Sequence, residues 1–203
     1  MHIICADLEG IFVPEVWINV AERTGIEELR LTTRDISDYD VLMKRRLAIL
    51  DENGLKLKDI TDAIGQMEPL DGALEFLEWL RSNTQIIVVS DTYIEFAKPL
   101  MRKLGWPTLL CHNLSIGSDG SIVGYNLRQK DSKREAVVSL KRLNYRVTGI
   151  GDSYNDISML KEADTGILFR PPDNVKDEFP EFPASYSYAE LKPIIQNKIE
   201  EYS

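Results

Sequence analysis

The sequence has little cysteine, little histidine and no long apolar run. Only two cysteines and two histidines occur among its 203 residues. Cys5 and Cys111 both lie in apolar runs typical of buried strands, so we interpret them as small core residues and not as a disulfide or metal pair. Because histidine is so scarce, acid–base chemistry is expected to depend on carboxylates and lysine.

Several partners and locations are disfavoured by the same composition. No apolar stretch approaches the roughly 20 residues of a membrane span, and the N-terminal run contains Asp7 and Glu9, which a signal peptide does not tolerate. The formal net charge of -9 would repel nucleic acid and anionic membranes. We therefore expect a cytoplasmic protein without nucleic-acid or membrane partners. The oligomeric state is not indicated.

Short apolar runs alternate with helical patterns over most of the chain. Runs rich in Ile, Val and Leu are typical of buried parallel strands and occur at Ile3–Leu8, Ile86–Val89, Thr108–Cys111, Val147–Ile150 and Gly166–Phe169. Apolar residues recur at helical spacing in Ala73–Ser82, Ile94–Gly105, Ser132–Asn144 and Ile157–Ala163. This alternation predicts an α/β fold with a doubly wound, Rossmann-like parallel sheet. Asp119-Gly120 predicts the turn of an added β-hairpin.

One segment interrupts the alternation. Between Glu15 and Pro69 the sequence predicts only helices, over Val16–Thr24, Tyr39–Asn53 and Lys58–Met67. We therefore predict a helical cap of residues 15–69 inserted after the first strand, and an α/β core of residues 1–14 and 70–203. Such an insert lies over the crevice where open α/β sheets bind ligands.

Four polar groups fall at the ends of successive predicted strands or at the start of the helix that follows one. They are Asp7-Leu8-Glu9-Gly10, Ser90-Asp91, Lys133 and the run Gly151-Asp152-Ser153-Tyr154-Asn155-Asp156. Each group alone is a weak signal. Their occurrence together and in this order indicates one site at the carboxyl edge of the sheet.

The four groups are suited to phosphoryl transfer. A carboxylate such as Asp7 can attack phosphorus and form an aspartyl-phosphate, which divides one difficult displacement into two easier ones. A phosphate anion approaches a carboxylate only when charge is neutralised, and Mg²⁺ held by Asp7, Asp152 and a backbone carbonyl near Glu9 would do so. Lys133 and the Ser90 hydroxyl would stabilise the phosphate oxygens. Glu9 would protonate the leaving oxygen and deprotonate the incoming acceptor.

The quartet resembles the four signature motifs of the haloacid dehalogenase superfamily, and the helical insert resembles its small cap. The segments 44–50 and 151–159 are similar to those of phosphoserine phosphatases. Asp-Leu-Glu-Gly at 7–10 and Val-Pro-Glu at 13–15 are similar to the bacterial bifunctional phosphoserine phosphatase/homoserine phosphotransferases. This likeness covers nearly the whole chain.

The resemblance implies a role for each matching residue. It implies Asp7 as nucleophile, Glu9 as acid/base, Ser90 and Lys133 as catalytic phosphate-binding groups, and Asp7, Glu9 and Asp152 as the Mg²⁺ ligands. It also implies substrate-binding residues, namely Glu15 for the amino group, Arg46 for the carboxylate, and Ser90, Asp91, Lys133 and Asn155 near the phosphate. The implied substrate is phosphoserine, with water and homoserine as acceptors. The superfamily usually has Asp as the acid/base. Here the residue is Glu9, whose extra methylene changes how far its carboxyl group reaches toward water or homoserine.

Some of these residues have structural alternatives. Arg46 follows two other basic residues and is also compatible with a solvated helix face. Asp156 is suited either to holding its loop by hydrogen bonds or to supporting the metal ligands. Lys130 competes with Lys133 for the phosphate, and the capping-box pattern at 132–135 favours Lys133.

Two other functions use the same kinds of residue. A receiver-like signalling module also has a strand-end Asp, Mg²⁺, a hydroxyl residue and a lysine, but Glu9 and the helical insert argue against it. A phosphatase of another small metabolite on the same fold is the second alternative. The pair of Glu15 and Arg46, which suits a zwitterion, distinguishes phosphoserine from such a metabolite.

Overall fold

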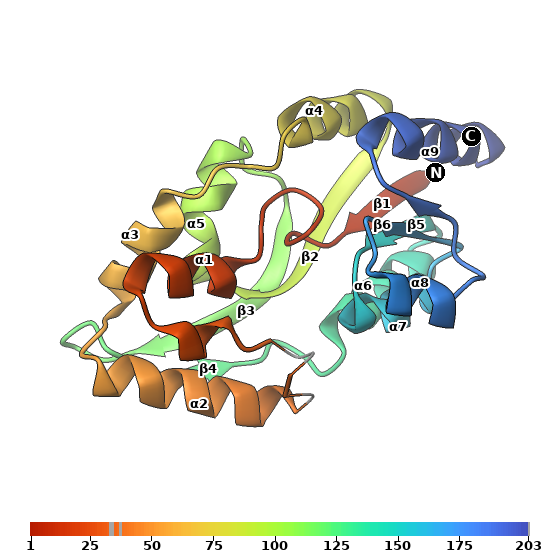
Figure 1. Ribbon diagram of the computed structural model, residues 1–203. Helices are drawn as coiled ribbons and strands as arrows, with labels where there is room; N and C mark the ends of the chain where they lie inside the picture. Colours follow the sequence, from red (N-terminus) through yellow and green to blue (C-terminus); the bar gives the residue numbers. More distant parts are fainter. Residues whose placement is uncertain (33–34, 37, 203) are drawn as a thin grey trace.

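The strands of the molecule form one mostly parallel sheet (Figure 1). The computed structural model describes residues 1–32, 35–36 and 38–202. Within them the strand order is β4-β3-β2-β1-β5-β6-β7, and only the β3–β4 pair is antiparallel. The strands are β1 (His2–Ala6), β2 (Gln85–Tyr93), β3 (Leu109–Ile116), β4 (Ile122–Asn126), β5 (Arg146–Gly151), β6 (Thr165–Phe169) and β7 (Ala184–Ser185). The predicted α/β class is confirmed.

Helices connect the strands and cover both faces of the sheet (Figure 1). They are α1 (Val16–Thr24), α2 (Tyr39–Glu52), α3 (Leu57–Gly65), α4 (Ala73–Asn83), α5 (Ile94–Lys103), α6 (Ser132–Arg142), α7 (Ile157–Glu162), α8 (Asp173–Glu178) and α9 (Tyr188–Glu201), with short 3₁₀ turns at Glu27–Arg30 and Tyr154–Asp156.

Alternate residues of β1 pack into two separate cores. Ile4 and Ala6 share a core with α4, α5 and α9, whereas Ile3 and Cys5 share one with α6 and α7. Side chains alternate between the faces of a strand, so β1 is apolar throughout because both faces are covered. Cys5 and Cys111 are buried free thiols, as predicted.

The chain between β1 and β2 is helical, as the sequence predicts, and contains α1, α2 and α3. The Leu70 amide donates a 2.9 Å hydrogen bond to the carbonyl of Phe12, so the two ends of this segment meet beside the sheet. Apolar residues of α1 and α3 belong to the same core as those of α5. No described helix is both long and apolar enough to cross a membrane.

Strand β2 is longer than predicted. The prediction ends it at Val89, but the strand continues to Tyr93, which pairs with His112 of β3 after an irregularity in register. Ser90 and Asp91 therefore lie within the irregular end of a strand. Local sequence does not reveal this extension, because it depends on pairing with β3.

Three elements near the C-terminus, β7, α8 and α9, are not predicted from the sequence. Strand β7 has only two residues and therefore leaves almost no periodic signal. Helix α9 has Pro193 in its interior, which disfavours a helix prediction. Its start carries a usable signal, since the Ser187 side chain accepts a hydrogen bond from the Glu190 amide.

Candidate active site

A pocket of about 750 Å³ lies at the carboxyl edge of the sheet, between the strand ends and the helical segment. Parallel strands bring their carboxyl ends to one edge, which is where open α/β sheets bind ligands. The structure gathers every residue that the sequence assigns to the site around this pocket: Asp7, Glu9, Glu15, Arg46, Ser90, Asp91, Lys133, Asp152 and Asn155.

Asp7 follows the last residue of β1 and is buried, with 4% of its surface exposed. One carboxylate oxygen accepts a 2.7 Å hydrogen bond from the Leu8 amide, and the other lies 3.0 Å from the Lys133 ammonium. Burial raises the pKa of Asp7 well above its usual value, Lys133 opposes the rise, and neighbouring carboxylates add to it. Asp7 is thus a nearly water-free carboxylate whose ionised form depends on Lys133.

Lys133, in the first turn of α6, is surrounded by acidic side chains. Its ammonium lies 2.7 Å from Asp156, 3.0 Å from Asp7 and 3.8 Å from Asp91. Burial lowers the pKa of Lys133, but these carboxylates outweigh burial and raise the pKa well above its usual value. Lys133 is therefore a permanent cation, whereas Lys130 lines the pocket but is exposed.

The predicted capping box at the start of α6 is wrong. Asp131 is the N-cap residue, in left-handed conformation with φ 51°, and its side chain does not cap the helix. Ser132 lies inside the helix and its hydroxyl donates to Asp91 at 3.4 Å. The Ser132 hydroxyl is directed to the pocket and not to the helix backbone. The capping pattern was therefore not a valid reason to favour Lys133 over Lys130, although Lys133 is the lysine that contacts Asp7.

Three carboxylates form an acidic cluster at the pocket, where Asp7 and Asp152 line the wall and Asp156 is fully buried. Asp7, Asp152 and Asp156 each place an oxygen within 4.8 Å of the others. Burial, with the nearby charge of Asp156, raises the pKa of Asp152 to about 7. One lysine faces this excess of negative charge, and hard oxygen ligands of this kind suit Mg²⁺.

Asp156 is already saturated with hydrogen bonds. It is fully buried, one oxygen accepts from Lys133 at 2.7 Å, and the other accepts from the amides of Asp152 and Ser153. Asp156 therefore orients the loop that carries Asp152 and fixes the position of Lys133. Asp7 and Asp152 remain the better oxygen donors for a metal ion.

Glu9 lies where the strand edge meets the helical segment. Its carboxylate accepts a 2.8 Å hydrogen bond from the Val16 amide at the start of α1. Burial, together with the nearby Glu15 carboxylate, raises the pKa of Glu9 to about 8. A pKa raised in this direction favours the protonated form, which could donate a proton in the pocket.

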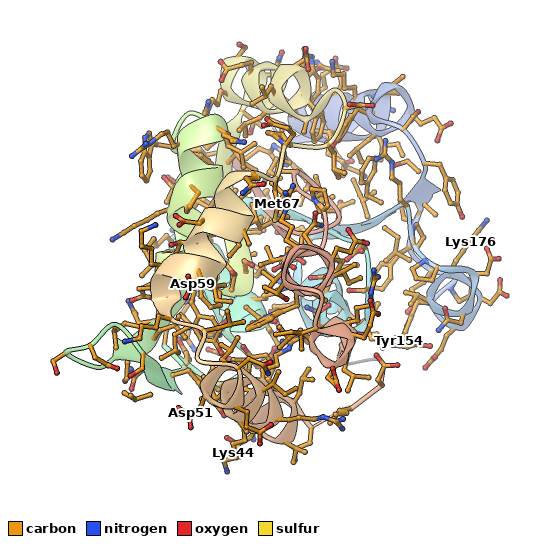
Figure 2. All side chains as sticks on the ribbon, turned by 60° about the vertical axis from the view of Figure 1, so that its left-hand side comes forward. Lys44, Asp51, Asp59, Met67, Tyr154 and Lys176 are labelled. Carbon is orange, nitrogen blue, oxygen red and sulfur yellow. The ribbon has the colours of Figure 1, made fainter. Side chains whose placement is uncertain are left out.

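Arg46 is buried in α2, which rules out the solvated-face alternative. Its guanidinium stacks on Trp17 at 4.4 Å and donates to the Leu31 carbonyl at 2.7 Å. Within the described residues, Arg46 Nε is a buried donor without a partner. In contrast, Figure 2 shows Lys44 on the outer side of the same helix, with 71% of its side chain exposed. An unpaired donor beside the pocket is suited to a ligand acceptor.

Ser90, Asp91 and Asn155 lie together on another side of the pocket. Ser90 is buried, and its hydroxyl accepts from the Thr92 amide at 3.2 Å. Asn155 donates to Asp91 at 3.5 Å. Burial would raise the pKa of Asp91, but Lys133 and His112 outweigh it and hold that pKa at about 2.

Several pocket residues are not assigned to the site by the sequence. The hydroxyls of Tyr39 and Tyr93 lie 2.7 Å apart, and Tyr39 also donates to the Asp91 carbonyl at 3.2 Å. His112 of the neighbouring strand β3 contacts Asp91 of β2 at 3.5 Å. For His112 a usable signal exists, because it directly follows the predicted strand Thr108–Cys111. Tyr39 and Tyr93 carry no such signal.

Comparison with known proteins gives consistent results. The model of the haloacid dehalogenase-like hydrolase family matches residues 5–164. The chain is 59% identical over 192 residues to phosphoserine phosphatase ThrH of Pseudomonas aeruginosa, covering 95% of this chain and 94% of that protein. It is also 59% identical to a phosphoserine phosphatase of Pseudomonas syringae pv. tomato, covering 95% and 81%. A solved phospho-aspartyl intermediate analogue of phosphoserine phosphatase has the same fold, with a TM-score of 0.76 at 20% identity over 95% of this chain and 98% of that one.

Proposed function

This chain belongs to the haloacid dehalogenase-like hydrolases, and we propose that it is a Mg²⁺-dependent phosphoserine phosphatase that carries the phosphoryl group on Asp7. Hydrolases of this family act through an aspartyl-phosphate. The observation that carries the proposal is the environment of Asp7, a buried carboxylate 3.0 Å from Lys133 in a pocket that also contains Glu15 and Arg46. Two Pseudomonas relatives named phosphoserine phosphatase support the choice of substrate.

The reaction has two steps. In the first, an Asp7 oxygen attacks phosphorus, the bond between phosphorus and the serine oxygen breaks, and Glu9 gives its proton to the departing oxygen. In the second, water attacks the phosphorus of the aspartyl-phosphate, the bond between phosphorus and the Asp7 oxygen breaks, and Glu9 accepts a proton from the water. Inorganic phosphate leaves and the Asp7 carboxylate is regenerated. The raised pKa of Glu9 supports this order, because the residue begins as an acid.

The phosphate oxygens are bound by the groups on the strand edge. Lys133, the Ser90 hydroxyl and the Asn155 amide all line the pocket beside Asp7. These donors neutralise charge that spreads over the phosphate oxygens in the transition state. Because Asp156 holds Lys133 in place, the ammonium is positioned before the substrate arrives.

The carboxylates of Asp7 and Asp152, with the backbone carbonyl of Glu9, would hold Mg²⁺. When bound, the ion supplies positive charge that allows a phosphate anion to approach a carboxylate. The pKa of both carboxyl groups is raised chiefly by burial and further by neighbouring carboxylates, so a bound cation would stabilise their ionised forms.

Gly10 makes room for Asp152, which gives a testable prediction. Gly10 has φ +74°, and a Cβ there would overlap the Asp152 carboxylate. We expect Gly10→Ala to lower kcat at least about tenfold and to raise the Mg²⁺ concentration for half-maximal activity, because a displaced ligand weakens the site. The measurement is turnover against Mg²⁺ concentration.

Gly54→Ala is the matched control for this prediction. Gly54 has φ +65°, but nothing lies within 4 Å of the position that a Cβ would take there. Both alanine variants carry the strain of left-handed backbone, roughly 1–2 kcal/mol. A Gly10→Ala enzyme with unchanged Mg²⁺ dependence would contradict the assignment of Asp152.

We propose that residues 15–69 form a cap that reads the amino-acid part of the substrate. Glu15, the N-cap residue of α1, and Arg46 of α2 both line the pocket. A carboxylate and a guanidinium match the ammonium and carboxylate of serine. The hydrogen bond between the Leu70 amide and the Phe12 carbonyl brings the two ends of the insert together, which supports the division into a cap of residues 15–69 and a core of residues 1–14 and 70–203.

Arg46→Ala is expected to act selectively on phosphoserine. We expect kcat/KM for phosphoserine to fall about 100-fold, as for loss of a charge-assisted hydrogen bond, with only a small change for an aryl phosphate that lacks the carboxylate. Both substrates are assayed with Lys44→Ala, an exposed residue of the same helix, as control. Equal loss on the two substrates would return Arg46 to a structural role.

We propose homoserine as a second acceptor beside water. Glu15 and Arg46 match the ammonium and the carboxylate that serine and homoserine share. Homoserine could therefore bind in the place that serine leaves. Binding turns a bimolecular attack into an oriented one. We expect ³¹P NMR of enzyme with phosphoserine, Mg²⁺ and millimolar homoserine to show phosphohomoserine forming as serine is released. Inorganic phosphate as sole product at every homoserine concentration would limit the acceptor to water.

A panel of phosphorylated metabolites assayed with Mg²⁺ tests the substrate itself. We expect phosphoserine to have the highest kcat/KM, ahead of sugar phosphates and nucleotides that lack a zwitterionic group. A higher kcat/KM for a nucleotide or sugar phosphate would show that the substrate is that metabolite and not phosphoserine. The panel therefore separates the main proposal from the alternative raised by the sequence.

A further inference from the structure

His112 lies outside the roles described so far, yet it lines the pocket and is buried, with 3% of its surface exposed. It belongs to β3, the strand beside β2. Its Nδ1 accepts a 3.0 Å hydrogen bond from the Arg128 amide. An imidazole nitrogen that accepts carries no hydrogen, so the ring proton of neutral His112 lies on Nε2.

The Nε2 atom faces the Asp91 carboxylate at 3.5 Å. Asp91 thereby lies between His112 on one side and two nitrogen groups on the other, because its second oxygen is 3.5 Å from the Asn155 amide and 3.8 Å from the Lys133 ammonium. Ser132 adds a contact at 3.4 Å on the His112 side. All of these distances are long for hydrogen bonds, so the Asp91 carboxylate lies among several donors and is not bonded tightly to one of them.

The position of Asp91 matters because Lys133 has several competing partners. Lys133 lies closer to Asp156 and Asp7 than to Asp91, at 2.7 and 3.0 Å against 3.8 Å. A closer Asp91 would attract the ammonium more strongly, since the energy of an ion pair varies inversely with distance. The same ammonium would then be less available to a phosphate beside Asp7.

We propose that His112 is a positioning residue whose Nε2–H holds the Asp91 carboxylate away from Lys133, so that the ammonium stays available to Asp7 and to the substrate phosphate. This inference rests on the proposed function. On this proposal Asp91 affects phosphate affinity indirectly, by competing for Lys133, and His112 has a role beyond packing.

The two ring nitrogens can be separated by substitution. In His112→Asn the amide oxygen can replace Nδ1 as the acceptor for the Arg128 amide, but no donor reaches Asp91. In His112→Gln the longer side chain can place its NH₂ near the Nε2 position and keep the donor to Asp91. A purely structural histidine would lose most in the variant that loses the contact with Arg128.

The experiment measures binding of inorganic phosphate, by calorimetry and as inhibition of phosphoserine hydrolysis, with thermal unfolding of each variant. We expect His112→Asn to weaken phosphate binding and raise KM for phosphoserine about tenfold, the scale of losing a polar contact to a charged group. His112→Gln is expected to recover most of this loss. Equal values for the two variants, or greater damage in His112→Gln, would overturn the proposal.

A double-mutant cycle tests whether the effect passes through Asp91. In an Asp91→Asn background, where the competing charge is gone, His112→Asn should change phosphate binding less than about twofold. An undiminished tenfold effect there would show that His112 acts by another route and would overturn the proposal.

Two further measurements keep the test independent of folding and of the proposed function. The ¹⁵N NMR shifts of the His112 ring in the unaltered protein should report a proton on Nε2, and a proton on Nδ1 would overturn the proposal without any variant. Failure of the unaltered enzyme to hydrolyse phosphoserine would refute the proposed function. The calorimetric comparison of phosphate binding would still decide the role of His112.

Discussion

Replacement of Asp7 by asparagine is expected to reduce phosphoserine turnover by at least about a thousandfold, because a neutral amide cannot attack phosphorus and no aspartyl-phosphate can form. The measurement is kcat under saturating phosphoserine and Mg²⁺, together with trapping of the phosphoenzyme after an acid quench. Unaltered enzyme should yield a phosphoenzyme and Asp7→Asn none. Retention of a tenth of the activity would exclude Asp7 as nucleophile.

The same substitution is not expected to destabilise the fold. Folding raises the pKa of Asp7, so its ionised form lowers stability at neutral pH, and asparagine removes that effect. Lys133 would also retain Asp156 as a partner, which it contacts at 2.7 Å in the unaltered protein. We therefore expect a thermal midpoint equal to or above that of the unaltered protein. A lower midpoint would show that the pair of Asp7 and Lys133 stabilises the fold more than the burial of Asp7 opposes it.

The positions of Asp7 and Asp152 in the site are predictable, because the sequence shows where the strands that precede them end. Asp7 and Asp152 each follow an apolar run, and parallel strands β1 and β5 pair so that these ends come together. No knowledge of distant contacts is needed for that inference. The placement of these two carboxylates at one edge of the sheet therefore follows from periodicity and strand direction.

Residues of the helical segment are less predictable. The pattern of α2 gives a helix, but three consecutive basic residues at 44–46 do not reveal which of them faces inward. The structure buries only Arg46 of the three, against Trp17 of another helix. Local propensity contains no information about such a contact between helices.

Pocket residues that depend on tertiary pairing are missed for a related reason. Tyr93 reaches the pocket because β2 continues past its predicted end and pairs with His112. Ser132 matches a helix-capping pattern, yet its hydroxyl contacts Asp91. In both cases a contact between distant segments replaces the structure that the local sequence favours.

Removal of Mg²⁺ is the second change expected to have a very large effect. Asp7, Asp152 and Asp156 share a small volume with one lysine, so without a cation the pocket repels a phosphate anion. We expect chelation followed by desalting to abolish phosphoserine turnover and added Mg²⁺ to restore it. Full activity in thoroughly metal-stripped enzyme would refute the requirement.

Mg²⁺ should also stabilise the folded protein, which gives a readout besides activity. A ligand that binds only the folded state at about 100 times its dissociation constant stabilises it by about 2.7 kcal/mol, so the thermal midpoint should rise with Mg²⁺. Asp152→Asn should remove most of this rise. Asp51→Asn, at an exposed position on α2 (Figure 2), is the matched control and should keep it. If the rise in midpoint were the same in both variants, Mg²⁺ would bind elsewhere, because only a site containing Asp152 loses affinity with that carboxylate.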